Sequence, residues 1–328
     1  MGIKTPLPML TMRPPIGDAN GAGASAVDRL GSEFESPHSS APCVDLHRHV
    51  WPDELVAMLG ARTAPPYLVG STLVTTEGRF SIDLEAHGAA ACVRNLDRDG
   101  IDVAVVSLQP SLGVADLSEE EAAAICAAYD GGVQRLVAAS NGRLQAFSSG
   151  GVCDGFVGLC VAADRLLDLE RLAPVVSELV ERGQALFVHP GPAAPPHEAP
   201  IWWASVVDYT AQMQAAFAAW IAGGAARWPS LPVVFAILAG GAPFQLERLS
   251  SRGVDLRRLE VGNVYLDTAS YGRLSLELCL AAFGVDRIVY GSDAPVIGAE
   301  ATLAAVNALG KVTADAIYRK NPATFLSV

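Results

Sequence analysis

From Cys43 to the end of the chain, short apolar runs alternate with longer stretches of helical periodicity. Short apolar runs bounded by turn residues are typical of buried strands, and apolar positions spaced by three or four residues are typical of helices packed on a sheet. The apolar runs predict eight strands, at residues 43–49, 101–108, 143–148, 155–161, 185–189, 232–238, 262–267 and 287–291.

Helical patterns fill the gaps between these strands. Ser118 begins a capping box, Ser-x-x-Glu, that predicts a helix from there to about Ala139. The stretch from Leu169 to Arg182 has apolar residues at helical spacing, and Gly183 ends it. Two further stretches behave in the same way, 212–225 and 274–283. Eight alternating βα units predict an α/β fold, a single (β/α)₈ TIM-type barrel with a parallel sheet.

The chain divides into a short leader and one domain. Residues 1–42 are rich in Pro, Gly, Ala and Ser and show no sustained periodicity, so they are interpreted as a flexible leader that includes His38. Residues 43–328 form the barrel domain, since a barrel of this length is one domain.

Composition narrows the classes of partner. The net charge is −12 with only three lysines, so neither nucleic acid nor an anionic membrane surface is an expected partner. Charged residues make up 18%, below the roughly 25% usual for soluble domains, which indicates broad burial and is compatible with a homodimer. No secretory signal and no long apolar run is present, and six scattered cysteines favour reduced thiols, so we expect a cytoplasmic protein.

Histidines carry the candidate chemistry. His47 and His49 are two residues apart on the first predicted strand, so both side chains point to the same face. His189 ends the fifth predicted strand and Asp293 follows the eighth. Catalytic groups of such barrels lie at the C-terminal ends of the strands, where these four side chains would meet. The sequence therefore predicts a metal site made of His47, His49, His189 and Asp293.

The chain from residue 43 to 328 resembles the amidohydrolase superfamily, in particular the amidohydrolase-related group that includes aminocarboxymuconate semialdehyde decarboxylase. The segments that carry the resemblance are Val44–His49, Phe187–Pro190, Arg227–Ala236, Gly240–Phe244, Tyr290–Pro295 and Asn321–Ala323. The resemblance implies one divalent ion, with Zn²⁺ expected, held by the four predicted ligands. It also implies that Asp293 acts as catalytic general base, and that the substrate is a small molecule. No glycine cluster has the spacing of a nucleotide-binding motif, so no nucleotide cofactor is expected.

The chain departs from the pattern of this group after the sixth strand. Members normally carry a histidine there, which would activate a metal-bound water, and Ile237 most nearly takes its place. Such acid–base help is typically worth about 10² to 10⁴ in rate, so its loss lowers activity or signals another reaction. His197, in the loop after the fifth strand, is a weak candidate to replace it.

A second departure concerns substrate binding. In the decarboxylase an arginine holds a substrate carboxylate, and Ser81 takes its place here. Arg79, two residues earlier, is a weak candidate for a displaced carboxylate clamp. Trp202, with its neighbour Trp203, is a weak candidate for a cavity wall, and Asp267 ends the seventh strand.

Three hypotheses follow. The first is a metal-dependent hydrolase that cleaves a C–N or C–O bond of a small metabolite with a metal-bound water. The alternative is non-oxidative decarboxylation of an aromatic or unsaturated acid, which relies less on an activated water. The third is a metal-binding barrel that has lost catalysis, for which Ile237 is the supporting observation.

Overall fold

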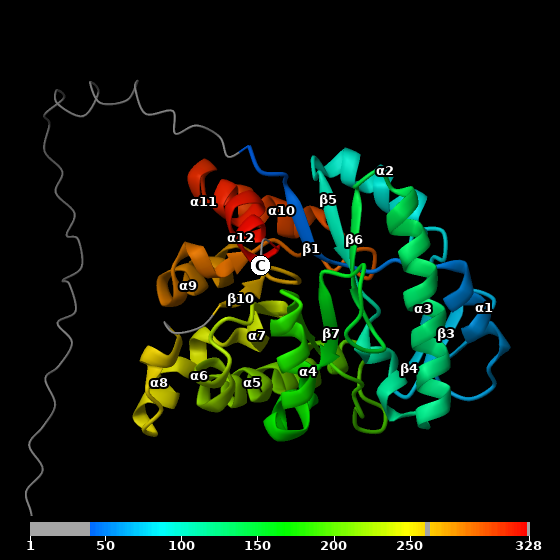
Figure 1. The fold of residues 1–328 in the computed structure, drawn as a ribbon, viewed down its shortest axis with the longest axis horizontal. Helices are drawn as coiled ribbons and strands as arrows, with labels where there is room; N and C mark the ends of the chain where they lie inside the picture. Colours follow the sequence, from blue (N-terminus) through cyan, green and yellow to red (C-terminus); the bar gives the residue numbers. More distant parts are fainter. Residues whose placement is uncertain (1–39, 260–262, 327–328) are drawn as a thin grey trace, which may run out of the picture. The chain divides into compact units, whose positions relative to one another are not determined.

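Eight parallel strands form the central sheet of the computed structural model, which describes residues 40–259 and 263–326. Their spatial order follows the order of the chain, so each strand pairs with the next βα unit (Figure 1). The strands are β1 (Val44–Arg48), β5 (Val103–Val106), β6 (Leu144–Ser148), β7 (Gly158–Ala162), β8 (Ala185–His189), β9 (Val233–Phe235), β10 (Val264–Asp267) and β11 (Ile288–Val289).

The first and last strands meet and nearly close the barrel. The backbone N–H of Leu46 donates to the carbonyl of Tyr290 at 2.9 Å, and that of His49 donates to Ala294 at 2.9 Å. Arg48 and Ala294 also form a parallel bridge. The predicted (β/α)₈ barrel is confirmed. The predicted leader, with His38, lies outside the described residues except for 40–42.

Helices connect the strands and cover the sheet. Ser118 precedes α3 as predicted, because its hydroxyl accepts the backbone N–H of Glu121 at 3.3 Å and donates to that residue's carboxylate at 2.7 Å. The helices are α1 (Asp53–Ala61), α2 (Ala89–Asp99), α3 (Glu119–Ala139), α4 (Leu169–Glu181), α5 (Tyr209–Ala219), α6 (Ala225–Arg227), α8 (Pro243–Ser251), α9 (Arg273–Phe283), α10 (Glu300–Asn307), α11 (Lys311–Asp315) and α12 (Asn321–Leu326).

Each barrel strand is buried on both faces, which explains why its sequence is a continuous hydrophobic run. Every residue of β1 and of β8 is buried, including the polar ones. Strands of a parallel barrel face the interior on one side and the helices on the other, so neither side meets water. A histidine or aspartate at the end of such a strand is therefore held by a rigid frame.

Two parts of the chain differ from the prediction. A three-stranded antiparallel sheet lies between β1 and β5, formed by β2 (Tyr67–Val69), β3 (Thr72–Thr75) and β4 (Gly78–Ser81). The sixth barrel strand ends at Phe235, so the prediction of a strand to residue 238 is wrong. The chain turns there because the segment labelled α7 (Ile237–Gly241) has positive φ throughout, from 47° at Ile237 to 82° at Gly241. Left-handed backbone cannot continue a strand.

Candidate metal centre

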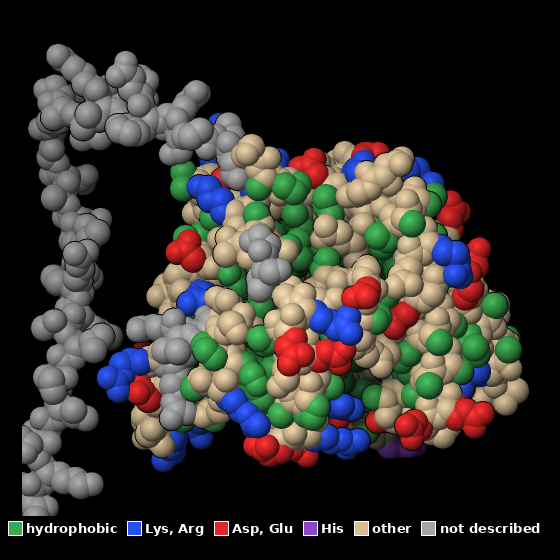
Figure 2. Space-filling view, in the orientation of Figure 1, with side chains coloured by type: hydrophobic (Ala, Val, Ile, Leu, Met, Phe, Trp, Pro, Cys, Tyr) green, Lys and Arg blue, Asp and Glu red, His purple; other side chains and the backbone are tan. Residues whose placement is uncertain are grey.

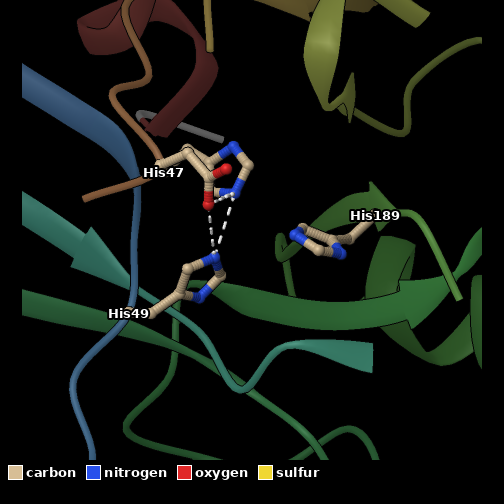
Figure 3. A group of neighbouring side chains, drawn as sticks. His47, His49 and His189 are labelled. Carbon is tan, nitrogen blue, oxygen red and sulfur yellow. Dashed lines mark hydrogen bonds and ion pairs between the residues drawn. The ribbon is translucent and has the colours of Figure 1, made fainter. Parts of the chain in front are cut away.

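Four side chains from three strand ends converge on one point. The ligand atoms offered by His47, His49, His189 and Asp293 all lie within 4.8 Å of one another. The Nε2 atoms of His47 and His49 are 3.2 Å apart, and Oδ1 of Asp293 lies 3.1 Å from Nε2 of His49. Figure 3 shows the imidazoles of His47 and His49, at the end of β1, grouped with that of His189 at the end of β8. The predicted ligand set is brought together.

Each histidine is oriented by a hydrogen bond from its other nitrogen. Nδ1–H of His47 donates to the Oδ2 of Asp267 at 2.7 Å, and Nδ1–H of His49 donates to the carbonyl of Ser107 at 2.9 Å. Nδ1–H of His189 donates to the carbonyl of Pro190 at 2.9 Å. In the neutral form of each ring these bonds keep the proton on Nδ1, so that Nε2 can present a lone pair toward the shared point, which is the arrangement found around metal-bound histidines.

The spacing fits a first-row divalent ion. Metal–nitrogen distances of about 2.1 Å in tetrahedral geometry separate neighbouring ligand atoms by about 3.4 Å. The contacts of 3.2 Å between the two Nε2 atoms and of 3.5 Å from Nε2 of His47 to Oδ1 of Asp293 agree with this value. Three neutral imidazoles and a carboxylate are also a donor set that suits zinc and its neighbours.

The turn after β11 is built to present Asp293. Asp45, on β1, accepts the hydroxyl of Ser292 at 2.7 Å and its backbone N–H at 3.1 Å. Gly291 must be glycine, because a Cβ at this position would lie 2.8 Å from Cβ of His47 and 3.0 Å from Cβ of Asp267. The backbone N–H of Asp293 then donates to the carbonyl of His47 at 2.9 Å. The sequence Gly-Ser-Asp is thus explained by close packing on β1.

The buried charges shift the pKa values of the candidate ligands in different directions. Burial lowers the pKa of His47, but the carboxylates of Asp267 and Asp293 outweigh it and raise the pKa to about 9. Burial, together with the charges of His47 and His49, lowers the pKa of His189 well below its usual value. Burial raises the pKa of Asp293, but the hydrogen bond from His49 and the charge on His47 lower it overall. Asp293 is therefore an ionised carboxylate at neutral pH, ready to bind a cation.

A cavity of about 690 Å³ opens beside the ligands, and His189 and Asp293 line it. This volume is in the range of sites for small organic molecules. Much of the wall is apolar or aromatic, with side chains that include Trp51, Phe80, Leu112, Ile201, Ile237 and Tyr271.

Ile237 lies in this wall and does not have the acid–base chemistry of a histidine. Its side chain is buried and its backbone N–H donates to Oδ1 of Asp267 at 2.9 Å. The same carboxylate orients His47 through Oδ2. Asp267 therefore supports the metal centre and fixes the turn that carries Ile237.

The three weaker candidates lie apart from the centre. Arg79 is exposed on β4 and lines a smaller cavity of about 220 Å³, which shares Glu77 and Ile201 with the larger one. His197 is exposed in the loop after β8, and Trp202 is 52% exposed and stacks on Trp203. Neither of these two lines the large cavity, so the structure does not place His197 beside Ile237.

Three residues that line the cavity were not predicted from the sequence. His87, just before α2, is buried beside Trp51, with ring centroids 4.8 Å apart. Glu77 and Tyr209 meet across the cavity, since the Tyr209 hydroxyl donates to the Glu77 carboxylate at 2.7 Å. The short strands β3 and β4 carry Glu77 between them, and no regular periodicity marks it in the sequence.

Charged side chains of both signs are mixed on the surface. On the face in Figure 2, Lys and Arg side chains are interspersed with Asp and Glu, and no area of a single charge dominates. Within the described ranges, no helix is long and apolar enough to cross a membrane.

The barrel and its four-ligand centre together define a metal-dependent enzyme of the amidohydrolase type. The sequence model of the Amidohydrolase family matches residues 44–328, so the chain belongs to that family. The predicted superfamily is thereby confirmed, and with it the prediction of a metal-dependent hydrolase or carboxy-lyase.

Solved structures share the fold at low sequence identity. IDCase from Metarhizium anisopliae is 20% identical with a TM-score of 0.75, over 88% of this chain and 98% of that one. The 5-carboxyvanillate decarboxylase of Novosphingobium aromaticivorans, solved with manganese and a nitrobenzoic acid, is 18% identical with a TM-score of 0.68, over 88% and 97%. The 2,6-dihydroxybenzoate decarboxylase of Rhizobium is 16% identical with a TM-score of 0.64, over 88% and 99%.

Proposed function

We propose that this protein is a metal-dependent, non-oxidative decarboxylase of a small aromatic or unsaturated carboxylic acid. The observation that carries the proposal is the wall beside the ligand centre, where Ile237 stands in place of a group that would activate water. Decarboxylation does not consume water, so an apolar wall at this position is compatible with it. The structural neighbours named as decarboxylases support the same choice over hydrolysis.

The four ligands would hold one divalent ion, which would bind substrate oxygens and stabilise the negative charge that develops on them. Asp267, Ser107 and the Pro190 carbonyl keep the three imidazoles in the required tautomer. Zn²⁺ remains the ion expected from the donor set, and the manganese in the 5-carboxyvanillate decarboxylase structure makes Mn²⁺ the second ion to test.

Asp293 is the residue placed to move a proton. Its Oδ1 is held by His47 and His49, whereas Oδ2 has no hydrogen bond to another described residue, and Asp293 lines the cavity. In the proposed reaction the C–C bond to the carboxylate breaks and CO₂ leaves. The electron pair stays on the substrate carbon, and a proton that Oδ2 of Asp293 takes up from solvent and passes on forms the new C–H bond.

Hydrolysis of a C–N or C–O bond is the second candidate, because the lowered pKa of Asp293 favours a base over a proton donor. The third hypothesis, a barrel without catalysis, has the least support, since the complete ligand set and the family membership both count against it. A homodimer and a cytoplasmic location remain predictions from the sequence.

The reaction is tested with a panel of hydroxylated benzoic acids and unsaturated acids on protein loaded with Zn²⁺ or Mn²⁺. We expect release of CO₂ and, in D₂O, one deuterium at the carbon that lost the carboxylate. Asp293→Asn should abolish both signals, and His197→Ala is the matched control because His197 is exposed away from the cavity. Product that instead carries ¹⁸O from labelled water, without CO₂, would identify a hydrolase.

A further inference from the structure

Glu77 brings a carboxylate into the wall of the large cavity that His189 and Asp293 also line, and it is not one of the four ligands. Its Oε2 accepts the hydroxyl of Tyr209 at 2.7 Å, and its Oε1 accepts the backbone N–H of Ala193 at 2.8 Å. Tyr209 is the first residue of α5 and Ala193 lies in the loop after β8. Three separate segments therefore fix the carboxylate in one orientation.

Both donors to this carboxylate are neutral. No lysine or arginine lines the large cavity among residues 40–259 and 263–326, and no cationic side chain in these ranges is among the groups that act on Glu77. Arg79, on β4, lines the smaller cavity, which Glu77 also lines, but it does not line the large one. The negative charge of Glu77 thus has no cationic side chain to balance it inside the space that a substrate would fill.

The electrostatic environment agrees with this geometry. Burial, opposed by the bonds from Tyr209 and Ala193, raises the pKa of Glu77 above its usual value. Burial and the charge of Glu77 also raise the pKa of Tyr209, so its hydroxyl stays protonated and donates. A half-buried carboxylate of this kind gains from any further donor and repels a second anion.

We propose that Glu77 selects the substrate of this site: it accepts a hydrogen bond from a donating substituent, an amino or hydroxyl group, and rejects a second carboxylate. The proposal rests on the proposed function, since it assumes that a first carboxylate faces the metal centre. The apolar wall then encloses the ring or unsaturated chain between them. The substrate class is a monocarboxylic aromatic or unsaturated acid with a donor substituent remote from its carboxylate.

Binding tests this directly, without turnover. Isothermal titration calorimetry of the full, metal-loaded chain would use 2-hydroxybenzoates that carry an amino, a methyl or a second carboxylate group at ring position 4. The same three substituents would be repeated at position 5. At the ring position where the amino ligand binds more tightly, we expect its affinity to be at least tenfold higher than that of the methyl ligand with the same position substituted. The dicarboxylates should bind most weakly of all.

Two variants assign the preference to Glu77. Glu77→Gln keeps the shape of the side chain and removes its charge. The ratio of the affinity for the amino ligand to the affinity for the dicarboxylate should therefore fall at least tenfold. Tyr209→Phe keeps the charge and should retain the ranking. A wild-type protein that binds the dicarboxylates as tightly as the amino ligands, or that binds none of the ligands, overturns the proposal, and so does an unchanged ratio in Glu77→Gln.

Failure of this proposal can be told apart from failure of the proposed function. Release of CO₂ from some acid, without the ranking of ligands, would remove the role of Glu77 and leave the reaction standing. The expected ranking with ¹⁸O incorporation and no CO₂ would remove the reaction and leave Glu77 as the selecting residue.

Discussion

The carboxylate of Asp267 holds the backbone of Ile237, with its Oδ1 2.9 Å from that amide nitrogen. Its other oxygen holds His47 at 2.7 Å. One buried carboxylate therefore links Ile237, which departs from the usual pattern of the superfamily, to His47, which follows that pattern. The turn at Ile237 is preserved through its backbone, so loss of a histidine side chain there leaves the metal centre intact.

Asp267→Asn should weaken metal binding about 10- to 100-fold, because an amide orients the His47 ring less firmly and makes Nε2 a poorer donor. The measurement is competition with a chromophoric chelator. Asp286→Asn is the matched control, since Asp286 is exposed in the turn before β11, at the end of that strand opposite Asp293. Equal affinity in Asp267→Asn and wild type would contradict the supporting role of Asp267.

Gly291→Ala should disturb the centre by steric contact alone. The added Cβ would lie 2.8 Å from Cβ of His47, so either β1 or the turn must move. Overpacking of this kind typically costs about 1–3 kcal/mol, and we expect a lower melting temperature together with weaker metal binding. Gly60→Ala is the control, because open space surrounds this helical glycine and the substitution should leave metal binding unchanged and raise the melting temperature slightly.

Metal affinity should rise with pH. The pKa of His47 is raised to about 9 without a metal, so below that pH its Nε2 carries a proton that must leave before a metal binds. The pKa of His189 is lowered, so that ring is already neutral and contributes no further proton. The apparent association constant should therefore increase up to about tenfold per pH unit between pH 6 and 9 and then level off. A flat profile in chelator competition would argue against His47 as a ligand.

Ile237→His tests whether this position controls activation of water. Histidine tolerates the φ of 47° better than a β-branched residue does, and its ring would face the cavity that Ile237 lines. With metal-loaded protein and 4-nitrophenyl acetate as a simple ester, we expect hydrolysis to increase at least tenfold, since acid–base groups contribute about 10²–10⁴ in rate. Ile237→Asn serves as a polar control without a titrating group. An unchanged rate in Ile237→His would mean that the position does not tune water activation.

Much of the barrel and its centre could be predicted because the signals are local. A buried parallel strand is an apolar run, and the residue that ends it must lie on the C-terminal rim. This logic placed His47, His49, His189 and Asp293 together although almost 250 residues separate the first from the last.

The rest depends on contacts that no periodicity encodes. The sheet of β2, β3 and β4 has strands of three or four residues, too short for a clear alternating pattern. Glu77 and His87 enter the cavity from this inserted region and its connection to α2. Ile237 and Leu238 are apolar, so the sequence predicts a strand that continues beyond the end of β9. Apolar character alone does not reveal their left-handed backbone.

The central claim is that four side chains hold one divalent ion, and metal content measures it most directly. Purified protein, reconstituted with Zn²⁺ or Mn²⁺ and dialysed, should contain about one ion per chain by elemental analysis. The double variant His47→Ala/His49→Ala should contain almost none, while His197→Ala should match the wild type. Equal metal content in the double variant and the wild type would contradict the site.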